Sequence, residues 1–176
     1  YGSQNKPFVY RCINRLDRDT TGLTIVAKHA LAGGILGNAV AKRAIHRTYY
    51  AVCSGCTPAC MRISAPIARK DASTIERCVD FKRGENAVTD FIRIKYNPDN
   101  NLSLVKLRLL TGRTHQIRVH MKYIGFPLIG DFLYNPDYTY ISRQALHSGR
   151  LVFTHPVTGQ KMNLISDIPS DMKSLF

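Results

Sequence analysis

The sequence predicts an α+β fold with a mixed, mainly antiparallel β-sheet and a few flanking helices. Segments with strand character greatly outnumber helical segments, and they do not alternate with helices as the βαβ units of a parallel sheet do. A chain of 176 residues is long enough to bury about 70% of its unfolded surface. We therefore expect one domain over residues 1–176.

Two segments near the start of the chain carry the first predictions. The run Leu23-Thr24-Ile25-Val26-Ala27 is rich in β-branched residues and follows Gly22, so we expect a turn and then a buried strand over residues 23–28. Residues 29–45 are rich in Ala, Leu and Ile and predict a helix, which each interior glycine weakens by about 1 kcal/mol.

Alternating segments predict the rest of the sheet. In residues 47–54 the alternation places Tyr49 and Ala51 on one face of a strand. Residues 87–109 predict a hairpin, because an Asn-Pro-Asp-Asn-Asn turn separates two strand-like segments. Further strands are expected at 61–67 and 75–81, and a final pair within 144–165.

A second helix is expected over residues 114–124, with its first residue as N-cap and with Gly125 as the C-terminal stop. Its apolar residues form one stripe, while His115, Arg118 and Lys122 form the opposite stripe. Because a cationic stripe of this kind is usually a solvent-exposed helix face, the pattern alone assigns it no other role.

The charge distribution indicates a nucleic-acid partner. Lys and Arg outnumber Asp and Glu by 25 to 12, which gives a formal net charge of +13. No acidic residue lies between Asp19 and Asp71 or between Asp99 and Asp131, and both segments contain several Lys and Arg. Long basic segments without acids favour a polyanion-binding face over a uniformly solvated basic surface.

Other partners and sites are not indicated. No run of 18 apolar residues occurs, so we expect no membrane partner, and no obligate protein partner is evident. Five cysteines without a secretory signal predict reduced thiols in the cytoplasm. Cys53, Cys56 and Cys60, with Cys78, resemble part of a zinc site, but no second close pair follows, so we expect no metal.

The loop before residues 23–28 holds the candidate acids. It contains Asp17 and Asp19 in the sequence Arg-Leu-Asp-Arg-Asp-Thr-Thr-Gly. A carboxylate on a loop held by a buried strand is well placed for acid–base chemistry. From the loop alone, however, a structural role is favoured, in which either side chain accepts hydrogen bonds from nearby backbone N–H groups.

Four motifs, in order along the chain, resemble those of the RluA-type (ribosomal large-subunit type) pseudouridine synthases. The family patterns are R-L-D-x-x-T-(S/T)-G, (K/R)-x-Y-x-A-x-V-x-G, T-G-R-T-H-Q-(I/L)-R-V-H-M and A-L-H-A…F-x-H-P. They correspond here to residues 15–22, 47–55, 111–121 and 145–156. The third matches at every position, whereas Asn14 replaces the His that usually precedes the first, and Cys53 replaces Val in the second.

This resemblance implies a sheet split by a central catalytic cleft and an isomerase that acts on uridine in ribosomal or transfer RNA. Uracil is detached from C1′ of the ribose, turned and rejoined through C5, so neither a cofactor nor a metal is needed. The sequence agrees, since it contains no phosphate-binding or dinucleotide-binding glycine motif. The resemblance also implies that the N-terminal part of the family domain is missing here.

The resemblance assigns the catalytic roles. Asp17 is implied as the catalytic carboxylate, acting on ribose or uracil as a nucleophile or on a ribose proton as a base, with Asp19 as a less favoured alternative. Tyr49 is implied to stack on the target base and to assist proton removal at C5, and Arg118 to form a salt bridge with Asp17. RNA or loop contacts are expected from Arg15, Arg47, Arg113, His115 and Lys122.

Two other interpretations of the same residues stay open. A noncatalytic RNA-binding domain with the same fold would use the basic faces and keep Asp17 in a structural role. A carboxylate-based hydrolase of N-glycosidic bonds would release free uracil. A binding domain would have no activity for Asp17→Asn to abolish, whereas a synthase would lose its turnover. A hydrolase would differ from a synthase in releasing uracil into solution.

Overall fold

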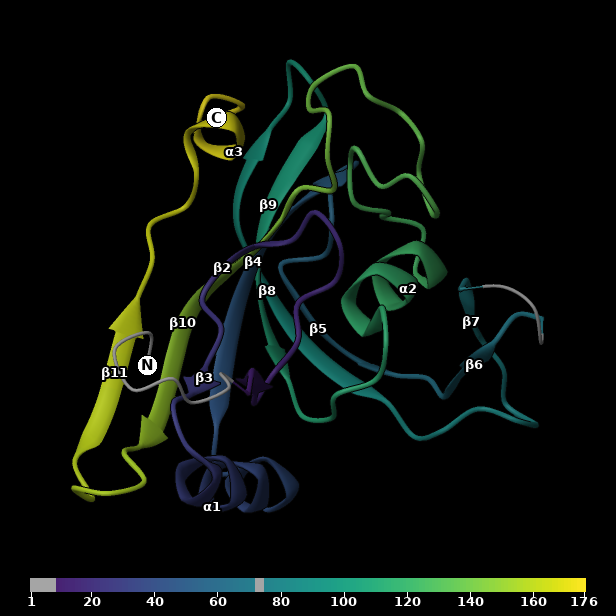
Figure 1. Ribbon diagram of the computed structural model, residues 1–176. Helices are drawn as coiled ribbons and strands as arrows, with labels where there is room; N and C mark the ends of the chain where they lie inside the picture. Colours follow the sequence, from purple (N-terminus) through teal and green to yellow (C-terminus); the bar gives the residue numbers. More distant parts are fainter. Residues whose placement is uncertain (1–8, 72–74) are drawn as a thin grey trace.

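The computed structural model describes residues 9–71 and 75–176. Within these residues a seven-stranded sheet runs in the order β11-β10-β4-β9-β8-β5, and β2 pairs with β10 beside that path (Figure 1). Its strands are β2 (Thr21–Gly22), β4 (His46–Ser54), β5 (Cys60–Ser64), β8 (Val88–Asn97), β9 (Leu102–Leu109), β10 (Leu146–Thr154) and β11 (Lys161–Ile165). The β2–β10 pair is parallel and the other pairs of this sheet are antiparallel. The predicted mixed, mainly antiparallel α+β fold is confirmed.

The remaining elements lie around this sheet. Two short strand pairs join β1 (Arg11–Cys12) to β3 (Val26–Ala27) and β6 (Ile67–Arg69) to β7 (Arg77–Val79). The helices are α1 (Ala30–Ala41), α2 (Gln116–Tyr123) and α3 (Ser170–Lys173). In Figure 1, α2 lies over one face of the sheet, α1 lies at the end where β4 begins, and α3 lies at the opposite end.

Of the buried strand expected over residues 23–28, the structure forms only the two residues of β3, and of these Ala27 alone is buried. Gly22 ends β2 with φ = 104°, packed so closely on the Ser148 backbone that a Cβ would lie 2.3 Å from its carbonyl oxygen. Beyond this turn the Asn14 side chain accepts a hydrogen bond of 2.9 Å from the Ile25 N–H. Residues 23–25 therefore lie outside a strand ladder and are held by a close backbone contact and by a side-chain acceptor.

The start of α2 also differs from the prediction. Thr114 is not the N-cap, because the helix begins at Gln116 and His115 occupies the cap with φ = 57° and ψ = 19°. The Gln116 side chain instead accepts a hydrogen bond of 2.9 Å from the Arg113 N–H and so fixes the turn. The predicted stop is confirmed, since Gly125 follows the helix with φ = 86°.

The strand β4 runs through the centre of the core. Its residues Tyr49, Ala51 and Cys53 are buried in one cluster with Ile117 and Met121 of α2, so the predicted alternation is confirmed. Val52 belongs to a different cluster on the opposite face, together with Met172 of α3. The second motif lies on β4 itself. This packing therefore places it against α2, which carries part of the third motif.

The cysteines do not gather as a zinc site requires. Cys53 is buried in β4, where burial raises the pKa of its thiol, whereas Cys56 and Cys60 are exposed. Among residues 9–71 and 75–176, no group of three or more His, Cys, Asp or Glu side chains is placed to hold a metal ion. The same residues include no helix long and apolar enough to cross a membrane.

The free energy of unfolding is expected to fall as the pH is lowered from 7 to 5, with His120 as one cause. His120 is fully buried, its Nε2 donates to the Ala65 carbonyl and its Nδ1 accepts from the Thr89 hydroxyl, each at 2.9 Å. Burial lowers its pKa below the ordinary 6.5. Below about pH 6.5 the unfolded chain therefore binds a proton at this histidine and the folded chain does not. The free energy of unfolding then falls by up to about 1.4 kcal/mol for each pH unit.

Urea unfolding at pH 7, 6 and 5 checks this. The wild type should lose stability across the series, and His120→Gln, which cannot titrate, should lose less of it. In His120→Gln the free energy of unfolding should still depend on pH, because burial also lowers the pKa values of His115 and His147. Equal slopes for the two proteins would contradict a buried neutral His120.

Candidate active site

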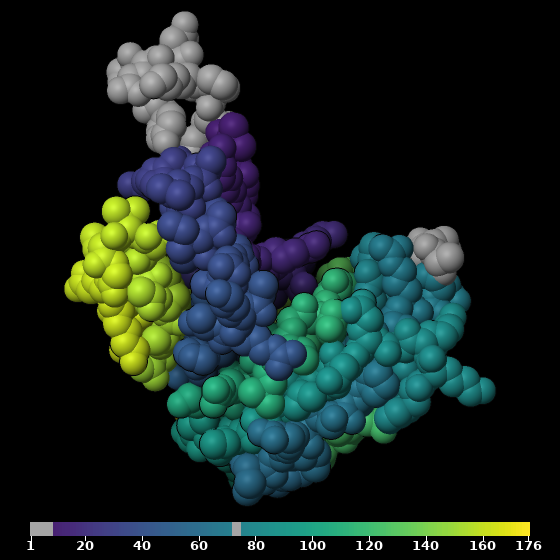
Figure 2. All heavy atoms as spheres, turned by 90° about the horizontal axis from the view of Figure 1, so that it is seen from below, coloured from purple at the N-terminus to yellow at the C-terminus, as the bar shows by residue number. Residues whose placement is uncertain are grey.

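A cavity of about 600 Å³ lies between the loop that carries Asp17, the start of β4 and the segment that joins β9 to α2. Figure 2 shows the surface hollowed between α1 with the start of β4, in blue, and the segment after β9, in green. All four motifs contribute to its lining. Six of the eight predicted site residues line it, namely Arg15, Asp17, Arg47, Tyr49, Arg113 and His115.

The acidic loop is fixed by the start of the last strand pair. Gln144, which is fully buried, donates from Nε2 to the Arg18 carbonyl at 2.7 Å and to the Thr20 hydroxyl at 2.6 Å. The Thr20 N–H donates to the Asp17 carbonyl at 3.0 Å and closes the turn. Asp19 pairs instead with the exposed Arg18 at 3.5 Å and does not line the cavity. Of the two loop acids, only Asp17 lines the cavity.

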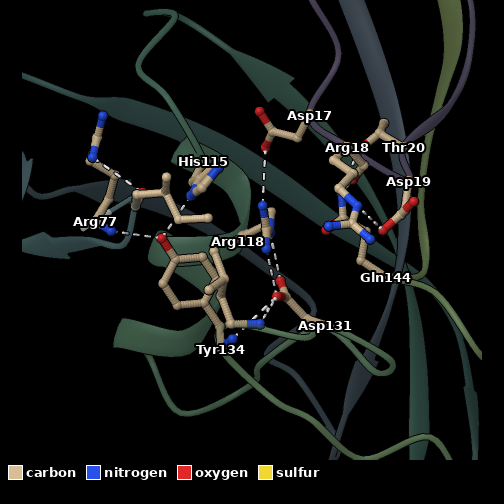
Figure 3. A network of polar contacts seen from close by, with 12 residues as sticks. Asp17, Arg18, Asp19, Thr20, Arg77, His115, Arg118, Asp131, Tyr134 and Gln144 are labelled. Atoms are coloured by element: carbon tan, nitrogen blue, oxygen red, sulfur yellow. Dashed lines mark hydrogen bonds and ion pairs between the residues drawn. The ribbon is translucent and has the colours of Figure 1, made fainter. Parts of the chain in front are cut away.

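Arg118 lies directly behind Asp17. Its Nη1 is 3.7 Å from Asp17 Oδ2, within ion-pair distance, as the resemblance implied. Its shorter contacts are with Asp131, whose two carboxylate oxygens accept from Nε and Nη2 at 2.7 Å each (Figure 3). Because Arg118 is only 1% exposed, the interpretation of its stripe as a solvated helix face is wrong at this position.

Asp131 is the main residue that the sequence analysis missed. It is fully buried, and its Oδ1 also accepts from the N–H groups of Leu133 and Tyr134 at 3.0 and 3.2 Å. A buried carboxylate is tolerated only when it is paired and hydrogen-bonded in this way. Burial opposes the charge on Arg118, but Asp131, aided by Asp17, raises the pKa of the guanidinium above its ordinary value. The sequence gives no signal for this role, because Asp131 is notable there only as the first acidic residue after the basic segment that follows Asp99.

Two aromatic rings hold the guanidinium and one of them also orients His115. The Arg118 guanidinium carbon lies 4.9 Å from the centre of the Tyr134 ring and 5.2 Å from that of Phe132. The Tyr134 hydroxyl accepts from the Arg77 N–H at 2.9 Å and shares a second hydrogen bond, also of 2.9 Å, with Nδ1 of His115 (Figure 3). Burial lowers the pKa of His115, so its imidazole is neutral at pH 7.

Tyr49 presents a neutral phenol to the cavity. The side chain is buried beside Ile117 and Leu146, with 5% of the residue exposed. Burial is the main cause that raises the pKa of Tyr49, Arg47 works against it, and the negative charge of Asp17 raises it further. The hydroxyl therefore stays protonated at neutral pH.

The predicted RNA-binding residues are not equivalent. Arg113 pairs with Glu85 and donates to the Asn86 carbonyl at 3.1 Å, so part of its hydrogen-bonding capacity is used within the protein. Among the residues that the structure describes, Arg15 and Arg47 have no carboxylate at ion-pair distance. Lys122 is exposed over the Tyr134 ring at 5.5 Å and does not line the cavity.

Known proteins are similar to this chain in sequence and in fold. A family model described as RNA pseudouridylate synthase matches residues 1–123. The Bacillus subtilis protein named uncharacterized RNA pseudouridine synthase YjbO is 47% identical over 166 residues, which are 93% of this chain and 57% of that protein. For ribosomal large subunit pseudouridine synthase D of Vibrio vulnificus the identity is 39%, over 93% of this chain and 54% of that protein.

A solved structure shares the fold as well. Human RNA Pseudouridylate Synthase Domain Containing 1 superposes with a TM-score of 0.80 at 26% identity, over 90% of this chain and 69% of that chain. The chain spans about half the length of the curated relatives that it matches.

Proposed function

Because the chain belongs to the RNA pseudouridylate synthase family, in its RluA-type branch, we propose that it isomerises specific uridines of ribosomal or transfer RNA to pseudouridine. One observation carries the proposal beyond family membership. Residues from all four motifs line a single cavity, and Asp17 is the only carboxylate among the described residues that line it. The cavity therefore offers one candidate for the catalytic group.

In this proposal the uracil N1–C1′ bond breaks, a C5–C1′ bond forms, the C5 proton leaves and N1 gains a proton. Asp17 acts on the ribose or uracil as a nucleophile, or removes a ribose proton as a base. Arg118, held by Asp131, keeps a positive charge 3.7 Å from the Asp17 carboxylate. The reaction is redox-neutral and intramolecular, so the proposal invokes no cofactor or metal.

The side chains around Asp17 receive the target nucleotide. The base must leave its stack, which costs a few kcal/mol, and Tyr49 offers a ring on which it stacks. His115 lines the cavity wall and offers a neutral imidazole as a hydrogen-bonding group. Arg15 and Arg47 supply positive charge for the phosphates. Arg113 contributes less, because it is paired with Glu85. Lys122 acts outside the cavity.

We also place the reaction in the cytoplasm. All five cysteines are free thiols, including the exposed Cys12, Cys56 and Cys60. Exposed thiols persist where glutathione and thioredoxin keep them reduced, and both proposed substrates occur there.

The proposal is tested by release of tritium from ribosomal and transfer RNA transcripts labelled at uracil C5. A synthase releases tritium and leaves pseudouridine in the RNA, without free uracil in solution. Free uracil would show the hydrolase, and RNA binding without tritium release or uracil would show the noncatalytic binding domain. Separate assays of the two RNA pools distinguish the ribosomal from the transfer RNA substrate.

Tyr49→Phe is expected to slow tritium release by roughly 10²- to 10⁴-fold while leaving RNA affinity within about threefold, because the ring remains and the hydroxyl is lost. Tyr49→Leu should also weaken RNA binding, by about 1–3 kcal/mol, because the stacking surface is lost. Steady-state kinetics and RNA binding for both variants check this, with thermal unfolding as a control for the buried ring. Full activity in Tyr49→Phe would show that the hydroxyl takes no part in proton removal.

A further inference from the structure

The face of the sheet opposite α2 carries a second hollow, of about 520 Å³. In the β4–β9 ladder Tyr49 pairs with Leu107, and Tyr50 pairs with Lys106. Because successive side chains on a strand point to opposite faces, Lys106 and its neighbour Arg108 lie on the face away from α2. The hollow is therefore distinct from the wall of the active-site cavity that Tyr49 forms.

This hollow, here called the outer-face groove, combines an apolar patch with positive charge. Its lining includes Ile92, which is 58% exposed, and the cations Lys106, Arg108 and Arg150. Arg150 donates to the neutral Asn163 side chain at 2.8 Å. Among the described parts of the chain, none of these three cations has a carboxylate at ion-pair distance.

Among the described residues that line the groove, Asp90 is the one carboxylate, and it is already paired. Asp90 accepts two hydrogen bonds from Arg62, at 2.6 and 2.8 Å, and these bonds are the main cause that lowers its pKa. Arg108 opposes Asp90 in the β8–β9 ladder and adds a weaker attraction. The groove as a whole thus presents excess positive charge to solvent.

The outer-face groove borders the active-site cavity. His46, Arg47 and Arg108 line both hollows, at the end of the sheet where β4 begins and β9 ends. A strand of RNA that leaves the cavity past Arg47 therefore meets Arg108 first and then Lys106 and Arg150. Continuous positive charge of this kind is typical of grooves that follow a nucleic-acid backbone.

We propose that the outer-face groove binds the RNA strand on one side of the target nucleotide, with Lys106 and Arg150 contacting phosphates and Ile92 contacting a base. This inference rests on the proposed function, since it extends the path of that substrate beyond the cavity. The groove adds affinity and fixes the direction in which the strand leaves the active site. It predicts that RNA long enough to reach the groove binds more tightly than RNA that fills only the cavity.

The test compares two double variants that remove the same charge. Lys106→Gln/Arg150→Gln removes two groove cations, and Lys82→Gln/Lys173→Gln removes two exposed lysines that line neither hollow. Binding to uridine oligonucleotides of three and of about 20 nucleotides is measured over a range of salt concentrations. This experiment measures binding and does not depend on catalysis. If the protein releases no tritium, the proposed function fails, but the comparison of the two variants can still be made.

The groove variant should bind the long oligonucleotide about tenfold more weakly, with a slope of log affinity against log salt that is less steep by about 1.4, or about 0.7 for each lost phosphate contact. Its binding of the trinucleotide should be unchanged, and the control variant should match the wild type on both. Equal weakening in the two variants would show a diffuse effect of net charge. No weakening in either would show a merely solvated cationic face. Each of these results overturns the proposal.

Discussion

Asp17→Asn is expected to abolish tritium release, lowering the rate at least about a thousandfold, while RNA affinity stays within about threefold. Asparagine has the shape of aspartate but is neither a nucleophile of comparable strength nor a base. The fold should survive, because Arg118 keeps its two hydrogen bonds to Asp131 when the more distant contact with Asp17 is weakened. The substitution should therefore lower the rate of the chemical step in the protein–RNA complex and not the affinity for RNA.

Single-turnover tritium release and RNA binding measure the two effects separately. Asp19→Asn is the matched control, because it makes the same chemical change on the same loop at a side chain that pairs with Arg18 and does not line the cavity. The control should keep its rate within about threefold. A wild-type rate in Asp17→Asn would refute the assignment, and equal losses in both variants would indicate damage to the loop instead.

Arg118→Ala is expected to cost both stability and activity. The substitution leaves Asp131 buried without its bidentate partner, and breaking a buried pair in this way costs about 3–5 kcal/mol of unfolding free energy. It also removes the cation 3.7 Å from Asp17, so tritium release should be lost. Urea unfolding and the tritium assay measure the two losses.

A double variant separates the two losses. In Arg118→Met/Asp131→Asn neither buried charge remains, and the amide oxygen introduced at position 131 would still accept from the N–H groups of Leu133 and Tyr134. Most of the stability should return, since a buried pair replaced as a whole is often neutral for folding. Activity should stay lost, because Asp17 still lacks its cation. Restored activity would show that Arg118 only holds the fold together, and wild-type stability in Arg118→Ala would refute the buried pair.

The sequence alone determined the features that depend on one segment at a time. The alternation over residues 47–54 placed Tyr49 and Ala51 on the same buried face, and the turn within residues 87–109 predicted the β8–β9 hairpin. The first follows from strand geometry, in which side-chain direction repeats every two residues, and the second from the residues of a local turn. The motifs likewise indicated Asp17, which the structure places in the cavity, although its role stays a proposal.

Only the tertiary structure decided what surrounds those residues. Helical spacing put Arg118 on a cationic stripe, but the segment after α2 folds back and covers it with Asp131 and Tyr134. In the same way, contacts of Gly22 with Ser148 and of Asn14 with Ile25 broke the strand expected at 23–28. Periodicity describes which face of an element a residue occupies. It contains no information on which distant segment packs on that face, and this packing is what buries a charge, supplies its partner and sets its pKa.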